Sequence, residues 1–361
     1  MIRSLIDLLR NLQSEEDCRL FLENIRWHGV PVCPHCGSKS EEHYKLTNGG
    51  VFRGLYKCKD CRERFTVTVG TMFEGSHIPL QKWFIAIYVF LAHKKGISST
   101  QLHKDIAVTQ KTAWFMLSRI RYSIRYNADI DFGDITQVDE TYIGGKNKNR
   151  NAGKRLKNTR GRSLKLKAPV MGLLSDGKVY VEPIPKASKW ILHGVINSLV
   201  PKGTTVVTDG WYGYKGLSEN YVHKVVDHHR GEYVKGGYHT NSIEGFWSQL
   251  KRGIIGVYHL VTRKHLELYC DEFAYRYNTR NLTDGERFSQ FLSIAKKTIK
   301  IPDVDIVIVN VHIHIPNKNI EDMNVTTRWY WAQNAAKTKK AVDVIIVGAS
   351  GTIVKTTVQS K

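Results

Sequence analysis

The sequence lacks any apolar run long enough to cross a membrane. A membrane-spanning helix needs roughly 20 consecutive apolar residues, and no stretch of the 361 residues approaches that length. The N-terminus (MIRSLIDLLRNLQSEED) also lacks the long apolar core and the small-residue cleavage site of a signal peptide, and has the pattern of an amphipathic helix instead. These absences argue against a membrane protein and against a secreted one, so we expect a cytoplasmic protein.

The sequence is also short of acidic residues. It has 33 Asp and Glu against 54 Lys and Arg, which gives a formal net charge of +21. Such an excess would repel itself unless a polyanion neutralised it, and nucleic acid is the usual polyanion. The excess lies in residues 1–300, with 47 basic residues against 28 acidic ones, whereas residues 301–361 have 7 against 5.

Cysteine is scarce, and four of the six cysteines form two CxxC pairs. The pairs are Cys33 with Cys36 and Cys58 with Cys61. In a reducing compartment such pairs are more often metal ligands than disulfides, although a redox role is the alternative. Four thiolates complete a tetrahedral Zn²⁺ shell without His35 or His43, so we predict a structural zinc site. The two pairs have the spacing of a zinc ribbon, and basic residues beside the second pair favour DNA over another protein as the partner of this segment.

Residues 96–114 have the spacing of a helix-turn-helix. Thr109 would cap the second helix, and Ala113 and Trp114 would return to the core. Recognition side chains lie at the start of the second helix of such a motif. The candidates here are Gln110, Lys111 and Thr112. The alternative is a helical hairpin that binds nothing.

Carboxylates interrupt two apolar, strand-like runs and lie near one predicted helix start. Asp139 and Glu140 lie within ITQVDETYI, and Asp209 ends TTVVTD. Successive strand residues point to opposite faces, so only one of Asp139 and Glu140 can be a central ligand. Glu244 lies near the start of a helix predicted over residues 242–252. Because buried carboxylates need compensation, these acids predict a Mg²⁺ site.

Each of these residues also has a purely structural interpretation. Asp209 before Gly210 can begin a turn, and Asn241 with Glu244 fits a helix cap and capping box. Lys251 lies on the same helical face as Glu244 and can simply be solvated. Their order on strand, strand and helix, in a strongly basic chain, favours a catalytic site.

A basic stretch separates the first two strands of this region. Residues 146–167 contain ten basic residues and no acidic one. A flexible loop of this composition binds phosphates and becomes ordered on binding; the alternative is a solvated run that aids solubility. The phosphate-binding candidates are Lys146, Lys148, Arg150, Lys154, Arg155 and Lys157.

Strand-like runs followed by helices predict a mixed α/β domain over residues 131–300. The segments before and after it are helices over 1–30, a zinc ribbon over 31–75, a helical DNA-binding region over 76–130 and a tail of unknown role over 301–361. The tail has apolar, strand-like runs at 304–315 and 341–354.

The run from about Leu5 to Asn281 resembles the DDE transposases of bacterial insertion sequences, in the branch with an N-terminal zinc ribbon. The matching motifs are CPHCG with CKDC, GTMFEGSHIPLQKWF, QVDETYIGG, TDGW and HTNSIEGFWSQLKRGIIGVYH. The resemblance implies a ribonuclease-H-like core whose acidic triad binds two Mg²⁺ or Mn²⁺ ions. It makes Asp139 and Asp209 the first two acids.

The resemblance implies Glu244 as the third acid and Lys251 as a lysine that contacts DNA. Some members of the branch carry asparagine in the third position, and Asn241 lies one turn before Glu244, so both stay candidates. The implied activity is cleavage of transposon ends and strand transfer on double-stranded DNA, by a homo-oligomer. The alternatives are a DNA-binding regulator with a relic nuclease domain and a structure-specific nuclease.

Overall fold

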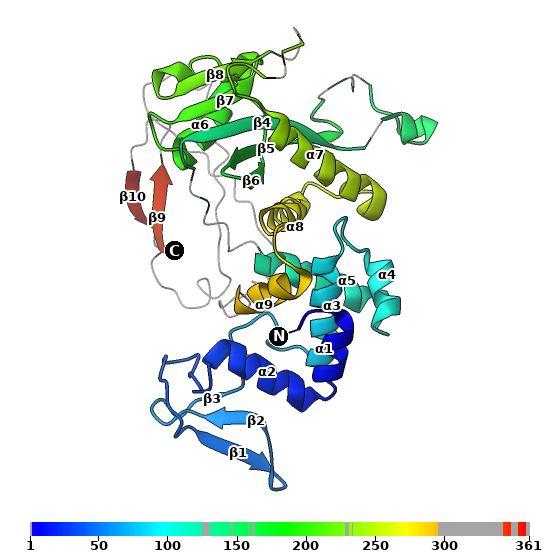
Figure 1. The fold of residues 1–361 in the computed structure, drawn as a ribbon, viewed down its shortest axis with the longest axis vertical. Coiled ribbons are helices and arrows are strands. Elements are labelled where there is room, and N and C mark those ends of the chain that lie inside the picture. Colours follow the sequence, from blue (N-terminus) through cyan, green and yellow to red (C-terminus); the bar gives the residue numbers. More distant parts are fainter. Residues whose placement is uncertain are drawn as a thin grey trace. The chain divides into compact units, whose positions relative to one another are not determined.

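The computed structural model describes most of the first 294 residues and two short segments beyond them (Figure 1). The described ranges are 2–124, 130, 132–145, 147–157, 159, 161, 163–227, 231–232, 234–294, 342–347 and 353–358. The chain divides into two compact units, Met1–Ile299 and Lys300–Lys361. Within the described ranges, no helix is long and apolar enough to cross a membrane.

The N-terminal part pairs two helices with a small sheet. The elements are α1 (Leu5–Asn11), α2 (Glu15–Trp27), β1 (Tyr44–Asn48), β2 (Val51–Lys57) and β3 (Arg64–Phe65). Ser14 caps α2 and forms the predicted capping box with Asp17. Trp27 of α2 packs edge-on against Tyr56, with ring centroids 5.5 Å apart, so α2 is anchored on the ribbon sheet.

A helical region follows, and its core includes a helix from much later in the chain. The elements are α3 (Leu80–Ala92), α4 (Ser99–Asp105), α5 (Gln110–Ile124) and α9 (Asp284–Ile294). Phe84 of α3 and Phe288 of α9 are both buried, with ring centroids 6.1 Å apart. Residues 284–294 therefore complete the hydrophobic core of the N-terminal helices. The domain boundaries predicted from the sequence include them in the α/β domain instead.

The helices α4 and α5, joined by a short turn, lie where the sequence predicts a helix-turn-helix, and one detail of that prediction is wrong. Thr109 accepts a hydrogen bond from the backbone N–H of Thr112 at 3.1 Å and so caps α5, and Ala113 is buried. The prediction that Trp114 returns to the core is wrong, because Trp114 is 48% exposed. One residue after Ala113 is about 100° further around the helix, so Trp114 falls outside the buried stripe.

A mixed five-stranded sheet forms the next layer. The strands are β4 (Ile135–Gly144), β5 (Lys167–Ser175), β6 (Lys178–Pro183), β7 (Thr205–Asp209) and β8 (Val222–Val226), in the order β6-β5-β4-β7-β8. β4, β5 and β6 pair antiparallel, whereas β7 pairs parallel with β4 and β8 pairs parallel with β7.

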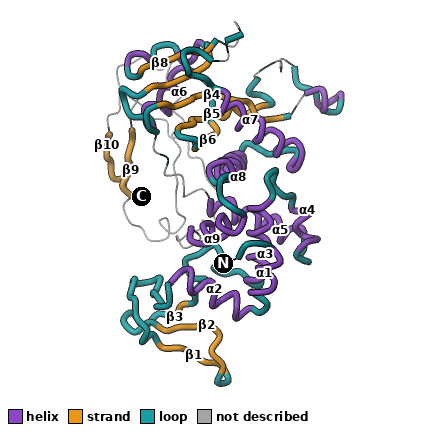
Figure 2. Tube along the Cα trace, viewed as in Figure 1, coloured by secondary structure: helices purple, strands orange, loops and turns teal. Residues whose placement is uncertain are grey.

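Helices cover both faces of this sheet, as Figure 2 shows. α6 (Lys189–Leu199) packs with Val138 and Val206 on one face, and α7 (Asn241–Gly253) and α8 (Leu266–Asn278) pack with Val170 and Val179 on the other. Three antiparallel strands followed by two parallel ones, between helices, make up the ribonuclease-H-like fold that the sequence predicted. That prediction is confirmed.

The second unit contains an antiparallel pair of strands, β9 (Val342–Val347) and β10 (Ile353–Val358). The apolar pattern at 341–354 predicted strands here. The other strand-like run of the tail, residues 304–315, lies outside the described residues.

Candidate functional site

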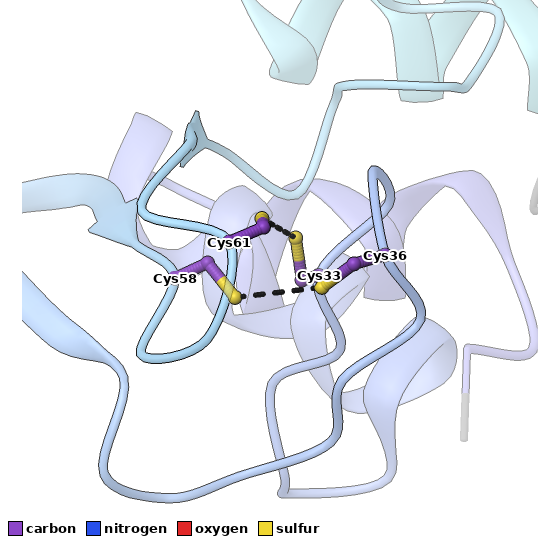
Figure 3. Close-up of side chains that lie close together, drawn as sticks. All are labelled: Cys33, Cys36, Cys58 and Cys61. Atoms are coloured by element: carbon purple, nitrogen blue, oxygen red, sulfur yellow. Dashed lines mark hydrogen bonds between the residues drawn. The ribbon is translucent and has the colours of Figure 1, made fainter.

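The four paired cysteines converge on one point of the ribbon (Figure 3). The sulfur atoms of Cys33, Cys36, Cys58 and Cys61 all lie within 4.8 Å of one another. Cys33 Sγ lies 3.7 Å from Cys61 Sγ, and Cys36 Sγ lies 3.6 Å from Cys58 Sγ. A tetrahedron with Zn–S bonds of about 2.3 Å has S–S edges of about 3.8 Å. The thiols therefore fit a zinc ion, and they are too far apart for disulfides, whose S–S bond is about 2.05 Å.

Backbone groups favour ionisation of one of the four thiols, that of Cys58, whereas burial raises the pKa of Cys33. Burial opposes ionisation of Cys58, but the backbone N–H groups of Cys61 and Asp60 donate to its sulfur and lower its pKa to about 6. His43 is buried beside the cluster, where its Nδ1 accepts the backbone N–H of Lys59 at 3.2 Å. His43 thus supports the second cysteine turn, which leaves four thiolates as the ligand set, as predicted.

Two of the predicted acids lie side by side on adjacent strands. β4 and β7 run parallel with Gln137 opposite Val207, which brings Asp139 and Asp209 to the same level of the sheet. Burial, the charge of Asp209 and the charge of Glu244 raise the pKa of Asp139 to about 6, although hydrogen bonds partly oppose this rise. The charges of Asp209 and Glu244 therefore both act on Asp139, and we call these three carboxylates the acidic cluster.

Glu140, the residue after Asp139, has a structural role on the other face of β4. Glu140 is buried, and its Oε2 accepts a hydrogen bond from the hydroxyl of Tyr214 at 2.7 Å. Tyr214 packs in the core beneath α6. Asp139 and Glu140 therefore lie on opposite faces, as the strand alternation predicted, and only Asp139 faces α7.

Trp247 of α7 holds Asp139, a contact that the sequence reasoning missed. Its indole Nε1–H donates to Asp139 Oδ2 at 2.9 Å, while the backbone N–H of Glu140 donates to Oδ1 at 2.8 Å. Gly172 is the β5 partner of Asp139, and a Cβ there would lie 2.7 Å from the indole ring. Only glycine leaves room for Trp247 to reach the carboxylate. The available signal was a tryptophan one turn after Glu244, since a buried indole N–H usually has an acceptor.

The start of α7 differs from the predicted cap. Thr240, not Asn241, is the N-cap residue, and Asn241 is exposed at the first helical position, so the interpretation of Asn241 and Glu244 as cap and capping box is wrong. A side chain from the sheet supplies an acceptor instead: Gln137 Oε1 accepts the backbone N–H of Ile243 at 3.3 Å. Glu244 is half-buried and close enough to Asp139 to raise its pKa.

Lys251 lies two turns after Glu244, at the far end of the same helix. Burial lowers the pKa of Lys251, the charge of Asp139 opposes that shift, and the charge of Lys167 adds to it. Lys251 is therefore within electrostatic reach of both Asp139 and Lys167, the last residue of the basic stretch.

The predicted DNA-binding residues differ in how free their side chains are. Gln110 is exposed but its Nε2 donates to Ser99 Oγ of α4 at 2.8 Å, and Thr112 contacts the cap residue Thr109 at the start of α5. Lys111 is exposed. In the basic stretch, Lys146 lies outside the described residues. The exposed members are Lys148, Arg150, Lys154, Arg155 and Lys157.

Comparison with known proteins defines the chain as a transposase. Residues 132–278 match the ISXO2-like transposase domain, and residues 13–64 match the transposase zinc-ribbon domain. An uncharacterized protein in transposable element ISH50 of Halobacterium salinarum is 30% identical over 280 residues, covering 74% of this chain and 92% of that protein. The chain belongs to the family of ISXO2-like transposases, the zinc-ribbon branch of DDE transposases that its motifs predicted.

Two solved structures are also similar. A pre-cleavage Mos1 transpososome has a TM-score of 0.24 and 13% identity, over 58% of this chain and 78% of that one. A Mos1 transposase paired-end complex with left transposon end has a TM-score of 0.23 and 11% identity, over 59% and 79%. These TM-scores are too low to support a fold assignment, which rests on the strand order and the family match instead.

Proposed function

We propose that this transposase cleaves the ends of an insertion sequence and transfers them to target DNA by two-metal-ion chemistry at Asp139, Asp209 and Glu244. The observation that carries the proposal is the parallel register of β4 and β7, which puts Asp139 and Asp209 at the same level of the sheet, with the charge of Glu244 also acting on Asp139. Like charges this close repel one another unless a cation or a proton intervenes. Hard oxygen donors of this kind fit Mg²⁺ or Mn²⁺.

Bound divalent ions would activate the attacking water or 3′-hydroxyl and stabilise the leaving oxygen. The chain's own residues hold the carboxylates in place for that task. Trp247 fixes one oxygen of Asp139, and the backbone N–H of Trp211 donates to Asp209 Oδ1 at 3.0 Å. Lys251, at the edge of the cluster, would contact a phosphate of the cleaved strand.

Double-stranded DNA is the proposed partner of the other basic parts of the chain. Lys111 on α5 and the exposed basic residues of the stretch between β4 and β5 would bind phosphates of the transposon ends and the target. Two ends must be brought together for transposition, so we expect a homo-oligomer on DNA, in the cytoplasm with the nucleoid. The zinc-filled ribbon would support this binding and take no part in the chemistry.

Replacing either aspartate with asparagine tests the proposal. Asp139→Asn or Asp209→Asn should abolish cleavage and strand transfer in Mg²⁺ but leave DNA affinity nearly unchanged, since the phosphate-binding residues are untouched. Gel assays of end cleavage and joining, beside a binding titration, measure both quantities. If both variants still joined ends, the proposed chemistry would be wrong.

A further inference from the structure

The residues that follow α7 adopt two rare backbone conformations in succession. Ile254–Tyr258 form a π-helix, and His259 has φ 59° and ψ −52°. The backbone N–H of Leu260 donates to the carbonyl of Tyr258 at 2.6 Å, which closes a γ-turn of the strained, positive-φ kind. Both conformations cost free energy and persist only where the surroundings hold them.

A buried polar group holds this turn at its base. The hydroxyl of Tyr258 donates to Glu272, which is buried, and the guanidinium of Arg121 lies 5.1 Å from the centre of the Tyr258 ring. Gly96 lies against the same hydroxyl, and a Cβ there would come within 2.0 Å of it. The turn is therefore fixed to α5 and α8 rather than loosely attached.

This fixed turn presents apolar side chains to solvent. Ile255 is 69% exposed and Leu260 is 70% exposed, whereas Ile254 is only 6% exposed. Exposed branched aliphatic side chains are poorly solvated, and here a strained and fixed backbone holds two of them in solvent.

The charge around the two side chains indicates which partner fits. Residues 245–266 contain no acidic residue. The exposed basic residues of this segment are Lys251, Arg252, Arg263 and Lys264. The guanidinium of Arg263 also donates to the carbonyl of Lys167, where the basic stretch ends, at 2.8 Å. A second copy of this surface would be repelled, whereas the phosphates of DNA would be attracted.

The position of the turn connects two proposed DNA contacts. His265 packs edge-on against Trp114 of α5, with ring centroids 6.3 Å apart. On its other side the turn continues from Lys251, which is within electrostatic reach of Asp139. Figure 1 shows α7 continuing into α8, which lies beside α5. DNA that reaches from the helix-turn-helix to the acidic cluster would therefore pass over Ile255 and Leu260.

We propose that Ile255 and Leu260 form an apolar wedge that inserts into double-stranded DNA and unstacks one base step between the helix-turn-helix and the acidic cluster. Apolar side chains inserted from the minor groove kink DNA in this way, at the cost of lost stacking. A fixed turn suits this role because it loses little conformational freedom on insertion. The wedge rests on the proposed function and explains how a paired strand would bend toward the carboxylates.

The experiment compares the double variant Ile255→Ala, Leu260→Ala with a matched pair of exposed aliphatic residues on α1, Ile6→Ala with Leu9→Ala. The probe is a duplex carrying the terminal sequence of the element, with 2-aminopurine replacing single adenines in turn. Wild-type protein and the α1 control should raise the fluorescence at one step, and the wedge variant should not. Cleavage of the paired duplex by the wedge variant should fall about 10- to 100-fold, the scale of an unstacking cost of a few kcal/mol.

A duplex mismatched at the same step should restore cleavage by the wedge variant to near the wild-type rate. If the wedge variant unstacks and cleaves the paired duplex like wild type, the wedge is wrong and the proposed function stands. If wild-type protein unstacks the duplex but cleaves neither substrate in Mg²⁺, the proposed function fails instead. If the wedge variant changes the oligomeric state without DNA, measured by light scattering, the two residues form an interface between copies, which overturns the wedge.

Discussion

The ribbon and the acidic cluster both bring together side chains of types that bind metals, but the thiols of the ribbon have the spacing of a zinc site, whereas the carboxylates of the cluster repel one another. In the ribbon, neutral thiols sit at the edge lengths of a zinc tetrahedron, and backbone N–H groups favour the thiolate of Cys58. In the acidic cluster, burial and two neighbouring carboxylates make the charged form of Asp139 unfavourable. A closed site adds to stability when its metal binds, whereas an open catalytic site costs stability to keep its ligands together.

The largest effect should come from the ribbon. Cys58→Ser removes one of four ligands, so we expect loss of the zinc and unfolding of residues 31–75, because binding free energies of structural zinc are on the order of 10 kcal/mol. Elemental analysis after dialysis should give one zinc per wild-type chain and none for the variant. Cys270→Ser, at a buried cysteine far from the ribbon in sequence, is the control and should keep its zinc. A wild-type chain that folds without any metal would contradict the prediction.

The next effect should separate the two candidates for the third ligand. Glu244→Gln should reduce the cleavage rate by several orders of magnitude, as expected for a lost metal ligand. Asn241→Ala should cost little, because Asn241 is exposed and the cap residue is Thr240. Single-turnover cleavage rates in saturating Mg²⁺ measure both. An inactive Asn241→Ala beside an active Glu244→Gln would assign the third position to Asn241.

A smaller effect should be seen in how the free energy of unfolding of the metal-free protein depends on pH. Asp139 has a folded pKa of about 6 against an ordinary value of 3.8. A raised carboxyl pKa gives stability that is present below pH 4 and is lost as pH rises through 6. The loss is about 3 kcal/mol for a shift of this size. Urea unfolding in EDTA should therefore show Asp139→Asn to be more stable than wild type at pH 8 and no more stable at pH 4. If wild type and Asp139→Asn were equally stable at both pH values, the proposed repulsion at Asp139 would be wrong.

The smallest effect should come from the indole that holds Asp139. Trp247→Phe keeps the ring over Gly172 but loses the donor to Asp139 Oδ2, so we expect activity to fall about 10- to 100-fold, as for other residues that orient metal ligands. The variant should also need more Mg²⁺ to reach half its maximal rate, which a simple packing defect would not cause. Gly172→Ala should reduce activity more than Trp247→Phe does, because the added methyl group collides with the indole.

Short-range patterns predicted much of this molecule. The capping box at Ser14, the two cysteine pairs, the cap at Thr109 and the strands that carry Asp139 and Asp209 all follow from residues close together in the sequence. The fold class followed from the order of these patterns and from the resemblance to a family.

Contacts between distant residues were beyond that reasoning. Trp247 reaches Asp139 across 108 positions of sequence, and this depends on where α7 lies over β5 and on the space at Gly172. The replacement of Asn241 by Thr240 as the cap is a shift of one residue that no local pattern decides. The prediction that Trp114 lies in the core was wrong because the sequence shows that a residue is apolar but not which way its side chain faces.

The packing of α9 against α3 has a consequence for biosynthesis. Phe288 fills the space beside Phe84, although the two are separated by the whole α/β sheet in sequence. During translation, the N-terminal helices emerge first but lack this part of their core until residues 284–294 have left the ribosome. Helices α3, α4 and α5 therefore gain their final packing only after strands β4 to β8 have been synthesised, so the proposed binding of DNA by α5 would be a late, post-translational property.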